Sequence, residues 1–195
     1  MMGSFDEAEY LSAVQSGDFS KLLAPQRRLL EQLRANPGLR AGDPSEALAQ
    51  LTEAAARMLG VERVGVWRFD QTRKALICLD LYVGAEARHE RGAMVPQRSA
   101  PDYFAAIETG EVIAAEDAFT DLRTHELGRN YLMIHQVGSL LDTPVMIDGQ
   151  LVGVLCHEHV GPPRRWRAWE RTLAASLSEC AGLVLGDVEA DRRSS

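Results

Sequence analysis

Four residues in a row, Cys156-His157-Glu158-His159, end an otherwise apolar run late in the chain. Thiol, imidazole and carboxylate groups are the side chains that bind metals and move protons. In a β-strand alternate side chains point to opposite faces, so His157 and His159 would share one face while Cys156 and Glu158 share the other. Two histidines would then need a third ligand from elsewhere, and the alternative is burial with satisfied hydrogen bonds. We therefore predict no metal site.

A second carboxylate, Asp142, lies in the preceding apolar run. Residues 139–147 and 151–159 predict two strands, and Asp148-Gly149 between them is a strong hairpin signal because both residues tolerate positive φ. Such a hairpin would place Asp142 and Glu158 on one face of a sheet. Paired carboxylates can carry out acid–base chemistry or recognise a cationic ligand. Alternatively, one is bound to the backbone or to an arginine and the other is exposed.

A polar loop upstream contains Asp121 and Arg123, two residues apart. Together they could contact a ligand carboxylate, phosphate or amide. Alternatively, Asp121 caps the following helix and Arg123 pairs with Glu126. Aromatic residues make up only 6% of the chain, so their placement around the same region is informative, although core packing explains any one of them.

The elements that must position these residues are predicted from apolar periodicity and turn residues. An α/β fold results, with one antiparallel sheet of five to six strands, the terminal helices on one face and the middle segments over the other. We expect helices over 5–16, 19–35, 44–59, 103–109, 126–134 and 166–188, and strands over 64–69, 75–83, 93–95, 112–115, 139–147 and 151–159.

Composition limits the functional classes. A net charge of -7 argues against nucleic acid or an anionic membrane as the main partner. No apolar run approaches the ~18 residues of a membrane helix, and no signal peptide is evident. The three cysteines, Cys78, Cys156 and Cys180, are widely spaced in apolar surroundings, which predicts neither a disulfide framework nor a zinc site. A reducing cytoplasm is the expected setting.

Several short motifs resemble those of GAF domains from bacterial sensor kinases and diguanylate cyclases. They are RVGVWRF at 63–69, DLRTHEL at 121–127, VGSLLDTP at 137–144, GVLC at 153–156 and EHVG at 158–161, and the resemblance covers residues 44–188. It implies three regions: an N-terminal helical extension over 1–38, a GAF domain over 39–188 and a polar tail over 189–195.

The resemblance implies a non-catalytic sensory module that binds a small molecule and signals through dimerising terminal helices. A histidine kinase or diguanylate cyclase would be the output partner, and the chain would form a homodimer. The alternative is a dimerisation module that binds no ligand. The candidate ligand-binding residues are Trp67, Tyr103, Asp121, Arg123, Tyr131, Asp142 and Glu158, with no catalytic residue among them.

Two other kinds of GAF domain fit less well. Bilin-binding members keep pocket histidines where this chain has Gly128 and Glu158, and the Cys-His attachment pair is absent from 125–130, so we expect no covalent bilin. The identity of any cofactor stays open. GAF-type free methionine sulfoxide reductases use clustered, exposed cysteines, whereas Cys78 and Cys156 fall in predicted strands and Cys180 in a predicted helix. A thiol redox enzyme is therefore the least favoured alternative.

Overall fold

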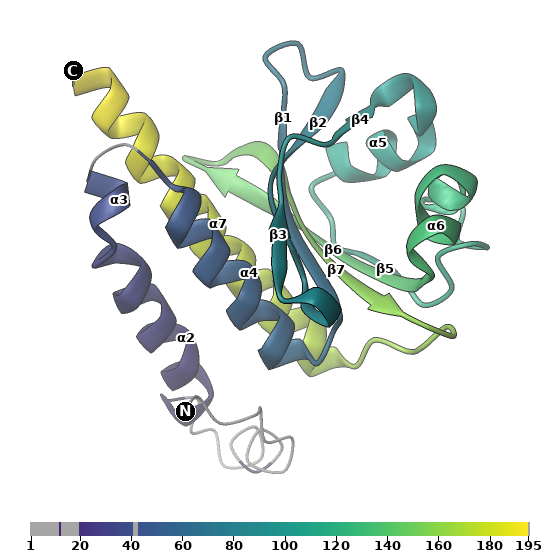
Figure 1. The fold of residues 1–195 in the computed structure, drawn as a ribbon, viewed down its shortest axis with the longest axis horizontal. Coiled ribbons are helices and arrows are strands. Elements are labelled where there is room, and N and C mark those ends of the chain that lie inside the picture. The colour runs from purple at the N-terminus through teal and green to yellow at the C-terminus, as the bar shows by residue number, and fades with distance from the viewer. Residues whose placement is uncertain (1–11, 13–19, 41–42, 195) are drawn as a thin grey trace.

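A computed structural model describes residue 12, residues 20–40 and residues 43–194 (Figure 1). Apart from Ser12, the helix expected over 5–16 lies outside these residues. Helices α2 (Ser20–Arg34), α3 (Pro37–Arg40) and α4 (Ser45–Leu59) precede the sheet, and α7 (Ala168–Ser194) follows it. None of the helices in the described residues has an apolar stretch that could span a membrane.

The sheet confirms the predicted fold class but has seven strands rather than five to six. Their order is β3-β2-β1-β7-β6-β5, with β4 also paired to β2, and every pairing is antiparallel. The unexpected strand is β3, whose residues are all charged or polar and sit at the edge of the sheet, where such residues are common. The strands are β1 (Arg63–Phe69), β2 (Ala75–Val83), β3 (Arg88–Glu90), β4 (Met94–Pro96), β5 (Ile113–Ala115), β6 (Val137–Ile147) and β7 (Gln150–Val160).

The predicted β6–β7 hairpin is confirmed. Asp148 and Gly149 have φ of 49° and 75°, the left-handed values that a two-residue hairpin turn requires. In the resulting register Asp142 faces Cys156, and Leu140 faces Glu158. Because directly opposed residues share a face, the two carboxylates are diagonal neighbours on one side of the sheet.

The opposite side of the sheet carries the larger core. Alternate residues of the central strands, such as Val66, Leu141 and Leu155, are buried against α4 and α7. Helix α2 packs outside this layer and contacts both of these helices (Figure 1). The strand face that remains is therefore free to meet the middle segments of the chain.

Those middle segments are α5 (Pro101–Glu108), η3 (His125–Leu127), η4 (Gly128–Leu132) and α6 (Met133–His135). The helix predicted over 126–134 is present from His125 to His135, but it consists of a 3-10 turn, a π-helical turn and one α-helical turn in succession. π-helical turns are frequent at functional sites. Helix α7 also differs from its prediction: it begins at Ala168 and continues to Ser194, so the backbone expected as a polar tail is helical up to that residue.

A close approach between α7 and β6 gives a first prediction. A Cβ at Gly182 would lie 2.3 Å from the Met146 carbonyl oxygen, whereas one at Gly186 would lie 3.5 Å from Ile147 Cγ2, an ordinary contact. We expect Gly182→Ala to lower the free energy of unfolding by about 1–3 kcal/mol, because α7 must move off the sheet. Gly186→Ala should raise it by up to about 1 kcal/mol through better helix propensity. Urea denaturation measures both, and equal effects would contradict the packing described.

Candidate functional site

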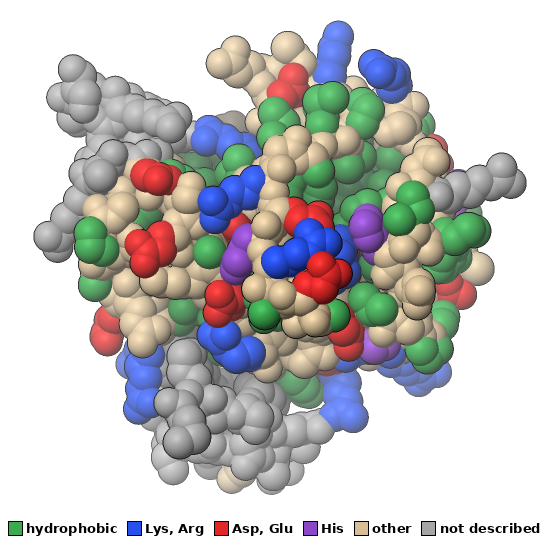
Figure 2. Space-filling view, in the orientation of Figure 1, with side chains coloured by type: hydrophobic (Ala, Val, Ile, Leu, Met, Phe, Trp, Pro, Cys, Tyr) green, Lys and Arg blue, Asp and Glu red, His purple; other side chains and the backbone are tan. Residues whose placement is uncertain are grey.

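A small pocket lies between the second face of the sheet and the middle segments. It encloses about 30 Å3, room for roughly one or two water molecules. Figure 2 shows hydrophobic side chains gathered in a hollow between β4 and the α5–α6 segments. The pocket is lined by Trp67, Leu76, Val95, Tyr103, Leu127, Tyr131, Leu140, Asp142, Cys156 and Glu158.

Five of the seven predicted ligand-binding residues therefore meet in one place, and they come from five different elements. The strands β1, β6 and β7 contribute Trp67, Asp142 and Glu158, while α5 and η4 contribute Tyr103 and Tyr131. The structure brings these residues together; their part in binding a ligand stays a prediction.

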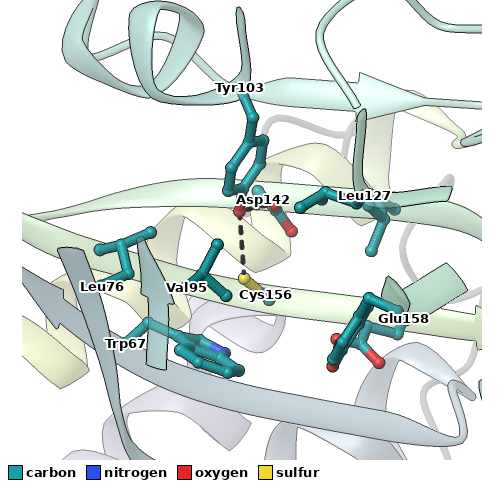
Figure 3. Close-up of a pocket in the computed structure, with 10 residues that line it drawn as sticks. Trp67, Leu76, Val95, Tyr103, Leu127, Asp142, Cys156 and Glu158 are labelled. Carbon is teal, nitrogen blue, oxygen red and sulfur yellow. Dashed lines mark hydrogen bonds between the residues drawn. The ribbon is translucent and has the colours of Figure 1, made fainter. Parts of the chain in front are cut away.

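Asp142 and Glu158, the two carboxyl groups of the pocket, are each only 2% exposed. Tyr103 Oη donates a hydrogen bond of 2.5 Å to Asp142 Oδ2 and lies 3.7 Å from Cys156 Sγ (Figure 3). Burial raises the pKa of Asp142 to about 7; the hydrogen bond from Tyr103 and the neighbouring Cys156 thiol oppose that rise, and the charge of Glu158 adds to it. Asp142 therefore holds its proton to a higher pH than an ordinary aspartic acid does. Its Oδ1 has no hydrogen-bond partner within the described residues.

Glu158 is held by two side chains that approach it from different elements. Arg63 Nε donates to Oε2 at 2.7 Å, and Tyr131 Oη donates to Oε1 at 2.5 Å. Arg63 Nη2 is also 3.3 Å from Tyr131 Oη. Burial, followed by the charge of Glu158, raises the pKa of Tyr131 well above its usual value, so the phenol stays protonated and donates.

Arg63 was not among the predicted site residues, although it is only 5% exposed and forms a buried ion pair with Glu158. The one signal in the sequence is a charged residue at the start of an apolar strand. That signal does not distinguish a buried site residue from a surface residue, since arginine at a strand end is usually exposed.

Trp67 supplies the second unpartnered polar group of the pocket. Its indole lies over Gly65, where a Cβ would come within 2.7 Å of Trp67 Nε1. Trp67 is 5% exposed, and no hydrogen-bond acceptor in the described part of the chain reaches Nε1. The pocket thus contains one buried donor and one buried acceptor that are both unused.

Asp121 and Arg123 do not line the pocket. They bind each other, with Arg123 Nε donating to Asp121 Oδ1 at 2.9 Å and Nη2 donating to Oδ2 at 2.6 Å. Arg123 does not pair with Glu126, whose Oε2 instead accepts the Asp102 backbone N–H at 2.8 Å. The Asp121–Arg123 pair is therefore an ion pair within the loop that precedes η3.

The two histidines of β7 have separate partners. His157 Nδ1 lies 2.8 Å from the Leu141 carbonyl oxygen, and burial lowers the pKa of His157 to about 4, so the neutral ring donates from Nδ1. His159 Nδ1 lies 3.1 Å from Glu62 Oε2. Within the described ranges, no group of three or more His, Cys, Asp or Glu side chains is placed to hold a metal ion.

The three cysteines are all buried and unpaired. Burial is the main cause that raises the pKa of Cys78 to about 12, that of Cys180 to about 11 and that of Cys156 well above its usual value. A reactive thiolate requires the opposite environment, which is electropositive and accessible.

A larger and more open groove of about 490 Å3 lies between α2, α3 and α4. None of the predicted residues lines it. Among the residues described there, no lining side chain carries a buried polar atom without a hydrogen-bond partner. The pocket on the sheet is therefore the better candidate for a ligand site. The groove is lined by Leu29, Gln32, Ala35, Asn36, Pro37, Glu46, Gln50, Glu53, Ala54 and Arg57.

Comparison with known proteins decides the family. A model of the GAF domain matches residues 43–185, most of the chain. The chain belongs to the GAF domain family. No curated protein sequence matches it. The seven-stranded sheet and the pocket between it and η4 are parts of this GAF domain.

Solved structures share this GAF fold at low sequence identity. The GAF domain of an Acinetobacter phosphoenolpyruvate-protein phosphotransferase is 17% identical with a TM-score of 0.68, over 87% of this chain and 95% of that one. The blue-light absorbing form of the Thermosynechococcus elongatus PixJ GAF domain is 23% identical with a TM-score of 0.65, over 82% and 94%. Residues 122 to 287 of a methyl-accepting chemotaxis protein are 19% identical with a TM-score of 0.66, over 83% and 97%. These likenesses establish the fold.

Proposed function

We propose that this GAF domain is a non-catalytic regulatory module that binds a small molecule in the pocket between the sheet and η4. One observation carries the proposal: residues from five elements converge on a pocket that holds a buried donor and a buried acceptor without partners among the residues described. Buried polar groups are almost always hydrogen-bonded in folded proteins, so such a pair indicates a place for another molecule.

The strands of the pocket offer a route for the signal. On the other face of β6, Thr143 Oγ1 lies 3.4 Å from the Ala174 carbonyl oxygen of α7, and Ser178 of α7 donates to the Pro144 carbonyl oxygen. A ligand that moves Asp142 would shift the same strand against α7. In a homodimer formed by α2 and α7, that shift would change the arrangement of the helices, provided that the ligand binds one arrangement better.

The setting that we propose is bacterial signal transduction in the cytoplasm, with a histidine kinase or diguanylate cyclase as the output partner. Two solved relatives, a methyl-accepting chemotaxis protein and a blue-light absorbing GAF domain, support a signalling role. We expect no covalent bilin, since Gly128 and Glu158 replace the pocket histidines of that group.

A second candidate function is a dimerisation module without a ligand. The enclosed space of about 30 Å3 favours it, because ligand pockets usually measure about 300–1,000 Å3. The thiol redox alternative is disfavoured by the raised pKa of all three cysteines.

Filling the pocket tests the first proposal against the second. Native mass spectrometry of the purified chain, beside its denatured mass, should reveal a small molecule that is lost on denaturation. Val95 lines the pocket while its neighbour Met94 is exposed, so Val95→Phe should abolish this extra mass and Met94→Phe should preserve it. A folded wild-type dimer with no bound mass, and with no thermal stabilisation by any compound of a metabolite library, would favour the dimerisation module.

A further inference from the structure

The unused donor and acceptor of the pocket stand at the two ends of a row that crosses three strands. In the sheet register Gly65 of β1 faces Cys156 of β7, and Cys156 faces Asp142 of β6. Neighbouring strands are about 4.8 Å apart, so the row spans about 10 Å between its outer backbones. Because the Trp67 indole lies over Gly65, its Nε1 occupies the β1 end, and Asp142 occupies the β6 end. Figure 3 shows Cys156 between them.

The other polar groups of the pocket are already occupied. Tyr103 donates to Asp142, and both Arg63 and Tyr131 donate to Glu158, whose charge is thereby compensated. The remaining lining is apolar and is made by Leu76, Val95, Leu127 and Leu140. Two polar atoms of the pocket, Asp142 Oδ1 and Trp67 Nε1, have no hydrogen-bond partner among the described residues, so a ligand gains most by pairing with these two.

We propose that the pocket recognises an uncharged, planar, ring-sized molecule that lies over Cys156, donates a hydrogen bond to Asp142 Oδ1 and accepts one from Trp67 Nε1. This inference rests on the proposed function of the pocket. An anion would meet two carboxyl groups while Arg63 is bound to Glu158. A cation would leave the indole N–H unpaired and would be desolvated against an apolar wall.

The enclosed space sets how such a molecule enters. About 30 Å3 holds only a water or two, so a ring requires outward movement of the lining. Val95 and Leu127 are only half-buried, so we expect the movement at these two side chains. A donor on Asp142 Oδ1 would also favour the ionised carboxylate, so binding should lower the pKa of Asp142 from about 7.

The test uses the indole N–H of Trp67 as a reporter in the full chain. The three tryptophans give three indole signals in a 15N NMR spectrum, and the variant Trp67→Phe identifies the relevant one. The probes are 4-aminoacetophenone, which has a donor and an acceptor at opposite ends, aniline with the donor only, acetophenone with the acceptor only, and benzylammonium as a cation. We expect 4-aminoacetophenone to bind at least about tenfold more tightly than each of the others, because a probe that lacks one group leaves a buried polar atom unpaired.

Two carboxyl-to-amide variants test whether Asp142 accepts the hydrogen bond that the amino group of the probe donates. An asparagine at 142 would accept from Tyr103 and turn its NH2 group to the ligand, so Asp142→Asn should weaken 4-aminoacetophenone and aniline about tenfold and leave acetophenone unchanged. Asp148→Asn, on the exposed hairpin turn, should change none of the affinities. Equal binding of the three neutral probes at Trp67, or strongest binding of benzylammonium, would overturn this ligand class while the pocket remains a small-molecule site. No shift of the Trp67 signal by any probe would count against both proposals.

Discussion

Replacing Glu158 by glutamine should lower the free energy of unfolding by about 3–5 kcal/mol, because it leaves the Arg63 guanidinium buried without a countercharge. Both side chains are almost fully buried, and they are joined by a hydrogen bond of 2.7 Å. When one charge of such a pair is removed, the desolvation penalty of the remaining buried charge is no longer compensated. Urea denaturation at constant pH measures the effect.

An exposed ion pair serves as the matched control. Arg73 and Glu108 are 44% and 48% exposed, so Glu108→Gln should change the stability by less than about 1 kcal/mol. The double variant Arg63→Met, Glu158→Gln should be less destabilised than Glu158→Gln alone, since no unpaired charge remains. A double variant less stable than the single one would show that packing, and not charge, dominates at this position.

Replacing Asp142 by asparagine should remove a loss of stability that the natural chain shows between about pH 4 and pH 7. The pKa of Asp142 is 3.8 in the unfolded chain and about 7 in the folded protein, mainly through burial. Between these two pH values the folded state keeps a proton that the unfolded chain has already released. The stabilisation that Asp142 gives through this proton is therefore complete below pH 4 and is lost as the pH rises through 7. A difference of roughly 3 between the two pKa values corresponds to about 4 kcal/mol of unfolding free energy.

The measured quantity is the difference in unfolding free energy between the variant and the natural chain at several pH values. His157 acts in the opposite direction, since its pKa is lowered to about 4 and its contribution is lost as the pH falls below 6.5. That contribution is common to both proteins and cancels in the difference. The unfolding free energy of Asp142→Asn should increase relative to that of the natural chain as the pH rises. The control variant Asp148→Asn should show no such relative increase. A difference that is constant from pH 4 to pH 8 would mean that Asp142 titrates like an exposed carboxyl group.

Local signals in the sequence were sufficient for most of the fold. Asp148-Gly149 between two apolar runs predicted the β6–β7 hairpin, and its positive φ values confirm the turn. Period-two alternation then predicted that Asp142 and Glu158 share a face, which the register also confirms. Residues 126–134 are helical as predicted, but the sequence did not reveal that the helix changes from 3-10 to π to α geometry. Prediction failed at the strand Arg88–Glu90, which has no apolar alternation.

What the sequence by itself determined is the hairpin of β6 and β7 and which of its polar side chains share a face, with Asp142 and Glu158 on the same one. The physical reason is that strand and turn geometry are properties of neighbouring residues. Only the tertiary structure decided the partners on each face. Arg63 reaches Glu158 across 95 residues of chain, and Tyr103 reaches Asp142 across 39. No periodicity encodes such pairs, because they depend on which strands and segments are packed together, and it was this packing that left Trp67 Nε1 and Asp142 Oδ1 without partners among the described residues.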